Sequence, residues 1–289
     1  MNKLKTIFMG TPEFAVPSLE ALKNKVDLIT VVTQPDRPKG RGQKLTPSPV
    51  KEWALKNSIP IMQPEKIKTE EFTNKLEELK PELIVVVAFG QILSKRILDL
   101  PKYGCINVHA SLLPRYRGAA PIEWSIINGE KKTGVTTMMM DVGLDTGDML
   151  IKREVDITED MILPELREKL MQLGAEALIE TIDKLVAGTL KREKQDNSLS
   201  NYAPMLTKET GLIDWNKSAQ EIHNLVRGLY GGAYTIINGQ KYKIWKTQIV
   251  DNKIEILEIQ APNSKKLAFA DYLRGHKDFK IPHSNLESR

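Results

Sequence analysis

The sequence predicts an α/β protein with a mostly parallel sheet, followed by a small β-rich domain that is barrel-like by its pattern. Residues 4–33 alternate strand, helix and strand, which is the opening of a parallel sheet. Residues 83–88 form a continuous apolar run, typical of a central parallel strand covered on both faces. Residues 233–259 hold three short alternating segments, typical of strands with one buried face.

The elements of the first domain follow from the spacing of apolar residues. The turn at residues 10–12, after the first strand, lacks the G-x-G-x-x-G pattern of dinucleotide-binding proteins, so NAD is not indicated. We expect strands at 4–9, 27–33, 83–88, 105–109, 134–140 and 149–155, and helices at 14–22, 50–57, 69–79, 121–127 and 163–186.

A linker is predicted to separate the two domains. Residues 189–207 are polar and weakly patterned, so we expect the first domain at 1–188 and the second at 208–289. Within the second domain we expect a helix at 214–229 and strands at 233–237, 241–249 and 253–259.

The composition bears on the number of domains, the cellular compartment and the presence of a metal site. The 289 residues are 41% hydrophobic and 27% charged, which suits two globular domains. The one cysteine, Cys105, excludes a disulfide framework and favours a reducing, cytoplasmic setting. The longest apolar run, 83–89, is far short of the roughly 20 residues that span a bilayer, and residues 1–10 read as a strand rather than a signal peptide. No Cys/His spacing suggests a metal site.

Basic residues gather in two places. Residues 190–289 carry 16 Lys+Arg against 11 Asp+Glu, which accounts for the whole net charge of +5. This excess suggests a polyanionic partner, with a merely solvated basic surface as an equal alternative on charge alone. The Pro- and Gly-rich stretch 34–49 suits neither helix nor strand and is long for a β–α connection. Its cations fit phosphate contact, with a charged surface loop as the alternative. These cations are Arg37, Lys39, Arg41 and Lys44.

The candidate catalytic residues lie at the end of a buried strand. Asn107 and His109 point to the same face, because strand side chains alternate, and the strand must end before Pro114. Ligands of open α/β sheets bind beyond such strand ends. Asp145 follows on a glycine-flanked loop, where it can hold an imidazole or relay a proton. A core histidine and a turn-forming aspartate remain the alternatives.

The residue types favour direct transfer to an amine. An imidazole can accept the proton of an attacking group, and the Asn107 amide can donate to a developing oxyanion. No G-x-S-x-G nucleophile motif is present, and Cys105 is a buried thiol without an adjacent base. A covalent enzyme intermediate is therefore not expected.

Several further stretches accompany the Asn107-x-His109-x-Ser111-Leu112-Leu113-Pro114 segment. They are YRGAAP at 116–121, MDVGLDTGD at 140–148, GTPEF at 10–14, PDRPKGRG at 35–42, YAP at 202–204, IDW at 213–215 and YLRGH at 272–276. Together they resemble the 10-formyltetrahydrofolate-dependent formyltransferases, and most closely the members that act on methionyl-tRNA. The resemblance runs from the N-terminus to about residue 277.

The resemblance implies a Rossmann-like catalytic domain followed by an oligonucleotide/oligosaccharide-binding (OB) barrel. Asn107, His109 and Asp145 match the catalytic trio, with Asp145 orienting His109 and helping to deliver a proton to the folate nitrogen. Arg41 matches an arginine that contacts tRNA. The implied donor is 10-formyltetrahydrofolate, without a metal, and the implied acceptor is initiator methionyl-tRNA; we expect a monomer. The implied folate-binding residues are Ser111, Leu112, Leu113 and Pro114, with Phe89, Gly90, Gln91, Ile92 and Leu93 at the pterin.

The chain departs from the family pattern in its last third. Met205 stands where the family usually has a lysine, and the turn at 229–234 and the segment 245–261 are short, so we expect a shortened second domain. Two alternatives remain open: an N-formyltransferase of sugar amines, which would generally lack the basic loop, and a tRNA-binding protein without activity. A glycinamide ribonucleotide formyltransferase would be shorter.

Overall fold

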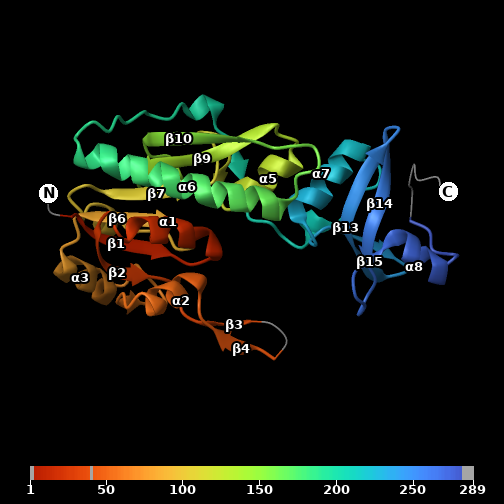
Figure 1. Cartoon of the computed structure of the whole chain (residues 1–289), viewed down its shortest axis with the longest axis horizontal. Helices are drawn as coiled ribbons and strands as arrows, with labels where there is room; N and C mark the ends of the chain where they lie inside the picture. The colour runs from red at the N-terminus through yellow and green to blue at the C-terminus, as the bar shows by residue number, and fades with distance from the viewer. Residues whose placement is uncertain (1–2, 40–41, 282–289) are drawn as a thin grey trace. The chain divides into compact units, whose positions relative to one another are not determined.

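The computed structural model of the chain describes residues 3–39 and 42–281 and divides into two compact units (Figure 1). The first unit comprises Met1–Arg117, Gly134–Glu154 and Glu168–Tyr202, and the second comprises Gly118–Thr133, Val155–Arg167 and Ala203–Arg289. Residues 118–133 and 155–167 therefore group with the C-terminal part of the chain. The functional division at 1–188, 189–207 and 208–289 stays a prediction.

The elements follow the predicted order, with short additions. The strands are β1 (Lys5–Gly10), β2 (Asp27–Val32), β3 (Arg37–Lys39), β4 (Lys44–Thr46), β5 (Ile61–Met62), β6 (Leu83–Val87), β7 (Cys105–His109), β8 (Arg117–Gly118), β9 (Lys132–Met139), β10 (Met149–Asp156), β11 (Tyr202–Ala203), β12 (Tyr234–Ile237), β13 (Gln240–Val250), β14 (Lys253–Gln260) and β15 (Leu267–Ala268). The helices are α1 (Val16–Leu22), α2 (Pro49–Lys56), α3 (Glu70–Leu79), α4 (Lys95–Leu98), α5 (Pro121–Ile127), α6 (Leu163–Val186), α7 (Ala219–Leu229) and α8 (Phe269–Gly275). Three short 3-10 helices cover Glu13–Ala15, Asn197–Leu199 and Glu209–Gly211.

A seven-stranded sheet carries the candidate site, with the strand order β10-β9-β7-β6-β1-β2-β5. β1 pairs in parallel with β2 and β6, and β6 pairs in parallel with β7. β9 runs antiparallel to β7. The prediction of a mostly parallel sheet is confirmed.

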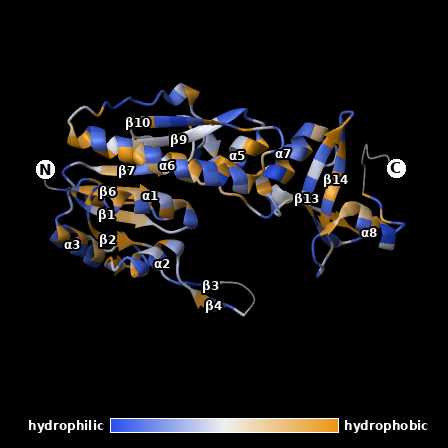
Figure 2. Cartoon of the chain, viewed as in Figure 1, coloured by the Kyte–Doolittle hydropathy of each residue, from blue (hydrophilic) through white to orange (hydrophobic). Residues whose placement is uncertain are grey.

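Helices cover both faces of this sheet, as the uninterrupted apolar strands require (Figure 1). Phe8 and Val108 belong to the cluster that packs against α1, α2 and α6. Ile84 and Cys105 belong to the opposite cluster, which includes residues of α3 and α4. Figure 2 shows apolar residues concentrated along β1, β2 and β6. The side chains that alternate with Val108 along β7 therefore face the α3 and α4 side.

The prediction that residues 34–49 suit neither helix nor strand was wrong. β3 and β4 form an antiparallel hairpin, in which Arg37 is opposite Thr46 and Lys39 is opposite Lys44. Pro38 is tolerated because this ribbon has two strands only, so a missing backbone donor can face solvent. Gly42 has a φ of 101°, in the left-handed region that glycine adopts readily, and this allows the chain to reverse.

The last third forms an antiparallel sheet with the order β12-β13-β14-β15. Ile244 and Ile259 on its inner face pack with Ile222 of α7 and Tyr272 of α8. Within residues 42–281 this sheet stays open, so the OB-like closed barrel is not confirmed. The antiparallel strands themselves agree with the sequence pattern.

Helix α7 starts five residues later than predicted. Ser218 accepts a hydrogen bond from the Glu221 amide, while the Glu221 carboxylate accepts one from the Ser218 amide, forming a capping box. The preceding Asp214 side chain accepts from the Asn216 amide, which makes a turn instead of a helix.

Candidate active site

Strand β7 places the two predicted polar residues at the carboxyl end of the sheet. Asn107 is opposite Met138 of β9, and His109 is opposite Thr136. The loop after β7 is fixed to β9 because the Thr136 hydroxyl donates to the Ser111 carbonyl, at 2.7 Å, and accepts from the Leu113 amide, at 3.1 Å. The strand end and the following loop are therefore held together around His109.

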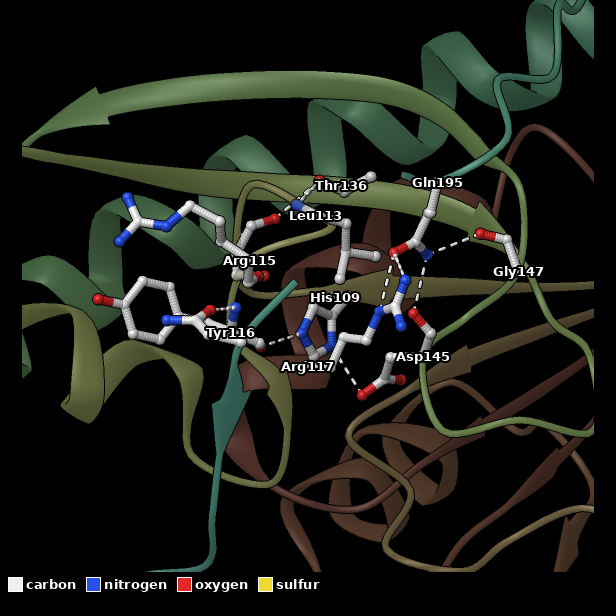
Figure 3. A network of polar contacts seen from close by, with 11 residues as sticks. His109, Leu113, Arg115, Tyr116, Arg117, Thr136, Asp145, Gly147 and Gln195 are labelled. Carbon is white, nitrogen blue, oxygen red and sulfur yellow. Dashed lines mark hydrogen bonds and ion pairs between the residues drawn. The ribbon is translucent and has the colours of Figure 1, made fainter. Parts of the chain in front are cut away.

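The His109 ring is buried, and one of its nitrogens is engaged by the backbone. Nε2 lies 2.9 Å from the carbonyl oxygen of Tyr116 (Figure 3). A carbonyl oxygen can only accept, so Nε2 carries the proton in this contact and Nδ1 is the nitrogen that exchanges one. The backbone thus selects the tautomer of the imidazole.

The Asp145 carboxylate faces the other ring nitrogen. Its Oδ2 lies 3.7 Å from Nδ1 of His109, and both side chains are largely buried. At this separation the carboxylate and the ring nitrogen are close but do not form a direct hydrogen bond. The structure therefore brings together the predicted histidine and aspartate, and Nδ1 is the ring atom that faces Asp145.

The loop that carries Asp145 is braced from within. The Asp141 carboxylate accepts from the Gly143 amide at 3.0 Å and from the Thr146 hydroxyl at 2.7 Å. A Cβ on Gly147 would lie 1.7 Å from the Met139 carbonyl oxygen, so only glycine allows this approach to the end of β9.

Asn107 lies two residues before His109 on the same face of β7 and is half-buried. In the part of the chain that the structure describes, its side-chain amide has no hydrogen-bond partner. An amide in this position can donate to a ligand, which is what stabilisation of an oxyanion requires.

The residues predicted to bind folate divide into two kinds. Leu113 is 1% exposed and packs with Met138 and Met149, and Phe89 and Leu93 are also buried. Ser111 is buried as well, and its hydroxyl donates to the Arg115 carbonyl. Those available to a ligand are Gly90 and Ile92, which are exposed, and Leu112, Pro114 and Gln91, which are half-buried.

Hydrogen bonds at Phe89 and Gln91 anchor the loop of residues 89–93. The Phe89 carbonyl accepts from the Thr11 hydroxyl at 3.0 Å and from Nε2 of the Gln34 side chain at 3.3 Å. The Gln91 side chain accepts from the Ile67 amide at 2.8 Å. Ile92, which is 68% exposed, directly follows this anchored segment.

The predicted basic residues lie in the β3–β4 hairpin. Arg37 and Lys44 are exposed, and Arg37 forms a 3.1 Å ion pair with Glu65. Lys39 belongs to β3, and Arg41 lies outside the described residues. Part of the predicted positive charge is therefore balanced within the protein.

Among the residues that the sequence reasoning missed are Tyr116, Gln195 and Arg117, which contact the His109–Asp145 pair or its supports. Tyr116 acts through its backbone carbonyl, which no side-chain pattern reveals. Gln195 bonds to the backbone of the Asp145 loop, and Arg117 bonds to Gln195 (Figure 3). Gln195 lies in the segment 189–207, whose polar and weakly patterned sequence predicted a linker and gave no indication of a contact with the site.

Three further features concern the cysteine, the metal-ligating residue types and the helices. Burial raises the pKa of the Cys105 thiol to about 12, so this cysteine stays protonated. Over residues 3–39 and 42–281, no three His, Cys, Asp or Glu side chains are grouped as metal ligands. Across the same residues, no helix has the length and apolar character needed to cross a membrane.

Comparison with known proteins defines the class of this chain. Residues 3–182 match the family described as Formyl transferase, and residues 205–255 match its C-terminal domain. The chain belongs to the formyl transferase family and is a formyl-transfer enzyme. Its curated relatives include a methionyl-tRNA formyltransferase of Ruminiclostridium cellulolyticum, 54% identical over 95% of this chain and 97% of the relative. One from Clostridium acetobutylicum is 52% identical over 94% of this chain and 97% of the relative.

Solved structures share the fold at lower identity. The sugar 3N-formyl transferase WlaRD has a TM-score of 0.64 and 24% identity, over 92% of this chain and 97% of its own. A methionyl-tRNA formyltransferase from Clostridium thermocellum has a TM-score of 0.61 and 18% identity, over 89% of this chain and 98% of its own. At these identities the likeness concerns the fold alone.

Proposed function

We propose that this chain transfers the formyl group of 10-formyltetrahydrofolate to the α-amino group of methionine on initiator methionyl-tRNA. The observation that carries the proposal is the 3.7 Å contact between His109 Nδ1 and Asp145 at the end of β7, beside Asn107. The relatives at about half identity over nearly the whole chain are methionyl-tRNA formyltransferases, which supports this acceptor over a sugar amine.

The proposed chemistry assigns one task to each polar group. The methionyl nitrogen attacks the formyl carbon, and its proton passes to Nδ1 of His109, because Nε2 is engaged by Tyr116. The oxygen of the tetrahedral intermediate gains negative charge and accepts from the Asn107 amide. Asp145 stabilises the imidazolium, whose proton then passes to the departing folate nitrogen as the old carbon–nitrogen bond breaks.

We infer that the folate lies against the 89–93 loop and the segment 111–114. The exposed Ile92 and the accessible backbone at Gly90 fit a flat heterocycle with a hydrogen-bonding edge. Leu113, Phe89 and Leu93 support this wall from beneath, since their side chains belong to the core. The structures of WlaRD with 5-N-formyl-THF and of HypX from Aquifex aeolicus with tetrahydrofolic acid support a folate-derived donor here.

We further propose that tRNA is bound by the basic hairpin and the last third of the chain. Arg37, Lys39, Arg41 and Lys44 would contact phosphates, and the antiparallel sheet of β12–β15 would act as a shortened OB-like module. Residues 1–188 would carry the reaction, 189–207 would link, and 208–289 would bind tRNA, with Met205 in place of a cation. The enzyme would act as a cytoplasmic monomer.

The test is transfer of labelled formyl from 10-formyltetrahydrofolate to charged initiator tRNA, with elongator methionyl-tRNA and a nucleotide-linked amino sugar as competing acceptors. The proposal expects the label on initiator tRNA. Equal or faster transfer to the amino sugar would favour the sugar-amine alternative. Binding of tRNA with no transfer to any acceptor would support the non-catalytic alternative and contradict the proposal.

A further inference from the structure

The side chain of Gln195 is bonded on both sides near the candidate site (Figure 3). Its Nε2 donates to the carbonyl oxygens of Asp145 and Gly147, each at 2.8 Å. Its Oε1 accepts from Nε and Nη2 of Arg117, at 3.0 and 2.7 Å. Carbonyls only accept and a guanidinium only donates, so the orientation of this amide is fixed by its partners. Gln195 therefore ties the Asp145 loop to the residue that follows Tyr116.

Asn201 holds Tyr116, the residue whose carbonyl is bonded to His109. Its Oδ1 accepts from the Tyr116 amide at 2.5 Å, and its backbone carbonyl accepts from the Arg117 amide at 3.1 Å. The carbonyl of the same Tyr116 accepts from Nε2 of His109. Asn201 thus fixes the residue that fixes the imidazole.

Both residues held in this way have an unfavourable backbone conformation. Tyr116 has a φ of 59° and Asp145 a φ of 53°, in the left-handed region that non-glycine residues rarely adopt. Such a conformation persists where surrounding contacts impose it, and it is concentrated at functional sites. Here each of the two residues is bonded through its backbone to an amide side chain from residues 195–201.

We propose that Gln195 and Asn201 are positioning residues that set the approach of His109 to Asp145. One amide fixes the loop of the carboxylate, the other fixes the carbonyl that selects the imidazole tautomer, and Arg117 joins the two. All these groups belong to the first compact unit. The segment expected only to link two domains therefore completes the catalytic geometry. This inference rests on the proposed function for its kinetic test.

The kinetic test uses the full chain with Gln195→Ala and Asn201→Ala. We expect kcat for formyl transfer to fall by at least about tenfold, because displacements of about 1 Å cost on the order of 10²-fold, while both KM values stay within about twofold. Asn201→Asp keeps an acceptor for the Tyr116 amide and should retain most of the activity. Ser200→Ala is the matched control, since among the described residues its hydroxyl bonds to the Asn197 carbonyl in the same segment and not to Tyr116 or to the Asp145 loop.

A second measurement separates positioning from general stability. Nitrogen NMR of the His109 imidazole, assigned with His109→Gln, should show the Nε2–H tautomer in the wild-type chain and in Asn201→Asp, and a mixture in Asn201→Ala. Should Gln195→Ala fail to fold, Gln195→Glu replaces it, because it keeps the Arg117 contact and loses both donors to the loop.

Different results would overturn the positioning role and the proposed function. Unchanged kcat in both alanine variants, a rise in KM alone, or an unchanged tautomer in Asn201→Ala overturns the positioning role. Equal losses in Asn201→Asp and Asn201→Ala also overturn it. A wild-type chain that transfers no formyl contradicts the proposed function instead, and the NMR comparison then decides the positioning role by itself.

Discussion

The Nε2 nitrogen of His109 lies 2.9 Å from the carbonyl oxygen of Tyr116, on the opposite side of the ring from Asp145. A backbone group therefore orients the imidazole, a task that the sequence pattern assigned to the carboxylate. Asp145 lies 3.7 Å from the other ring nitrogen, Nδ1, without a direct hydrogen bond to it. This arrangement leads to predictions for the site and for the fold around it.

Replacing the imidazole should abolish most of the rate. His109→Gln keeps an amide that can donate to the Tyr116 carbonyl but removes the proton acceptor. We expect kcat to fall by about 10²- to 10⁴-fold, the usual contribution of general acid–base catalysis, with folate binding retained. Single-turnover transfer assays measure the loss, and His276→Gln on the second unit is the control. A variant with more than a tenth of the wild-type rate would exclude His109 as the base.

A methyl group at Gly147 should disturb the Asp145 loop. The Cβ of Gly147→Ala would overlap the Met139 carbonyl oxygen at 1.7 Å, so the loop must move. Overpacking of this kind costs about 1–3 kcal/mol, and the shift of Asp145 should lower kcat by at least about tenfold. Thermal unfolding and transfer assays report the two effects. Gly275→Ala, where a Cβ would meet open space, should leave both unchanged.

Stability should fall in mild acid because of His223 in the second unit. Burial is the main cause that lowers the pKa of this histidine below its usual 6.5, and the charge of Arg227 adds to it, whereas Asp160 and Glu159 oppose it. The unfolded chain therefore binds the proton more readily, so stability is lost as pH falls below about 6.5. The Thr247 hydroxyl and the Glu159 carbonyl, both bonded to the ring, enclose it.

Unfolding midpoints between pH 5 and 8 test this dependence. His223→Gln should flatten the acid side of the curve, because a neutral amide cannot take up the proton. His276→Gln is the matched control, because it also removes one histidine from the second unit. If both variants show the same acid loss, other groups cause it.

Cys105 should be inert in the folded protein. It is 1% exposed, and burial raises its pKa to about 12. At pH 8 the thiolate fraction is therefore negligible, and alkylation should proceed only after denaturation. Quantitative labelling with iodoacetamide in the native and unfolded states measures this, and Cys105→Ala should retain transfer activity. Rapid labelling of the native chain would contradict the burial.

Removing a hairpin cation should weaken tRNA binding in a salt-dependent way. Lys44 is exposed at the start of β4, so Lys44→Ala should lower the slope of log K against log salt by about one if this lysine contacts a phosphate. Titrations of tRNA at several salt concentrations give the slope. Lys75→Ala, on the exposed face of α3, is the charge-matched control. Equal slopes for Lys44→Ala and the wild-type chain would remove this lysine from the interface.

Local patterns in the sequence were enough to find most of the fold. The apolar run at 83–88 and the strand–helix–strand opening predicted the parallel sheet, because burial on both faces leaves a direct hydrophobic signature. The helix at 163–186 has the predicted bounds. The β3–β4 hairpin was missed because its pairing depends on backbone hydrogen bonds, and a segment of proline and charged residues has no alternating apolar pattern that predicts a strand.

The sequence by itself determined which side chains have chemistry to offer: Asn107 and His109 share a strand face, and Asp145 lies on a glycine-flanked loop. Only the tertiary structure decided which ring nitrogen of His109 is free to exchange a proton, because Tyr116 acts through a carbonyl that every residue has. It also brought Gln195 within hydrogen-bond distance of Asp145, fifty residues away along the chain. Such contacts join groups distant in the sequence, and neither periodicity nor composition encodes them.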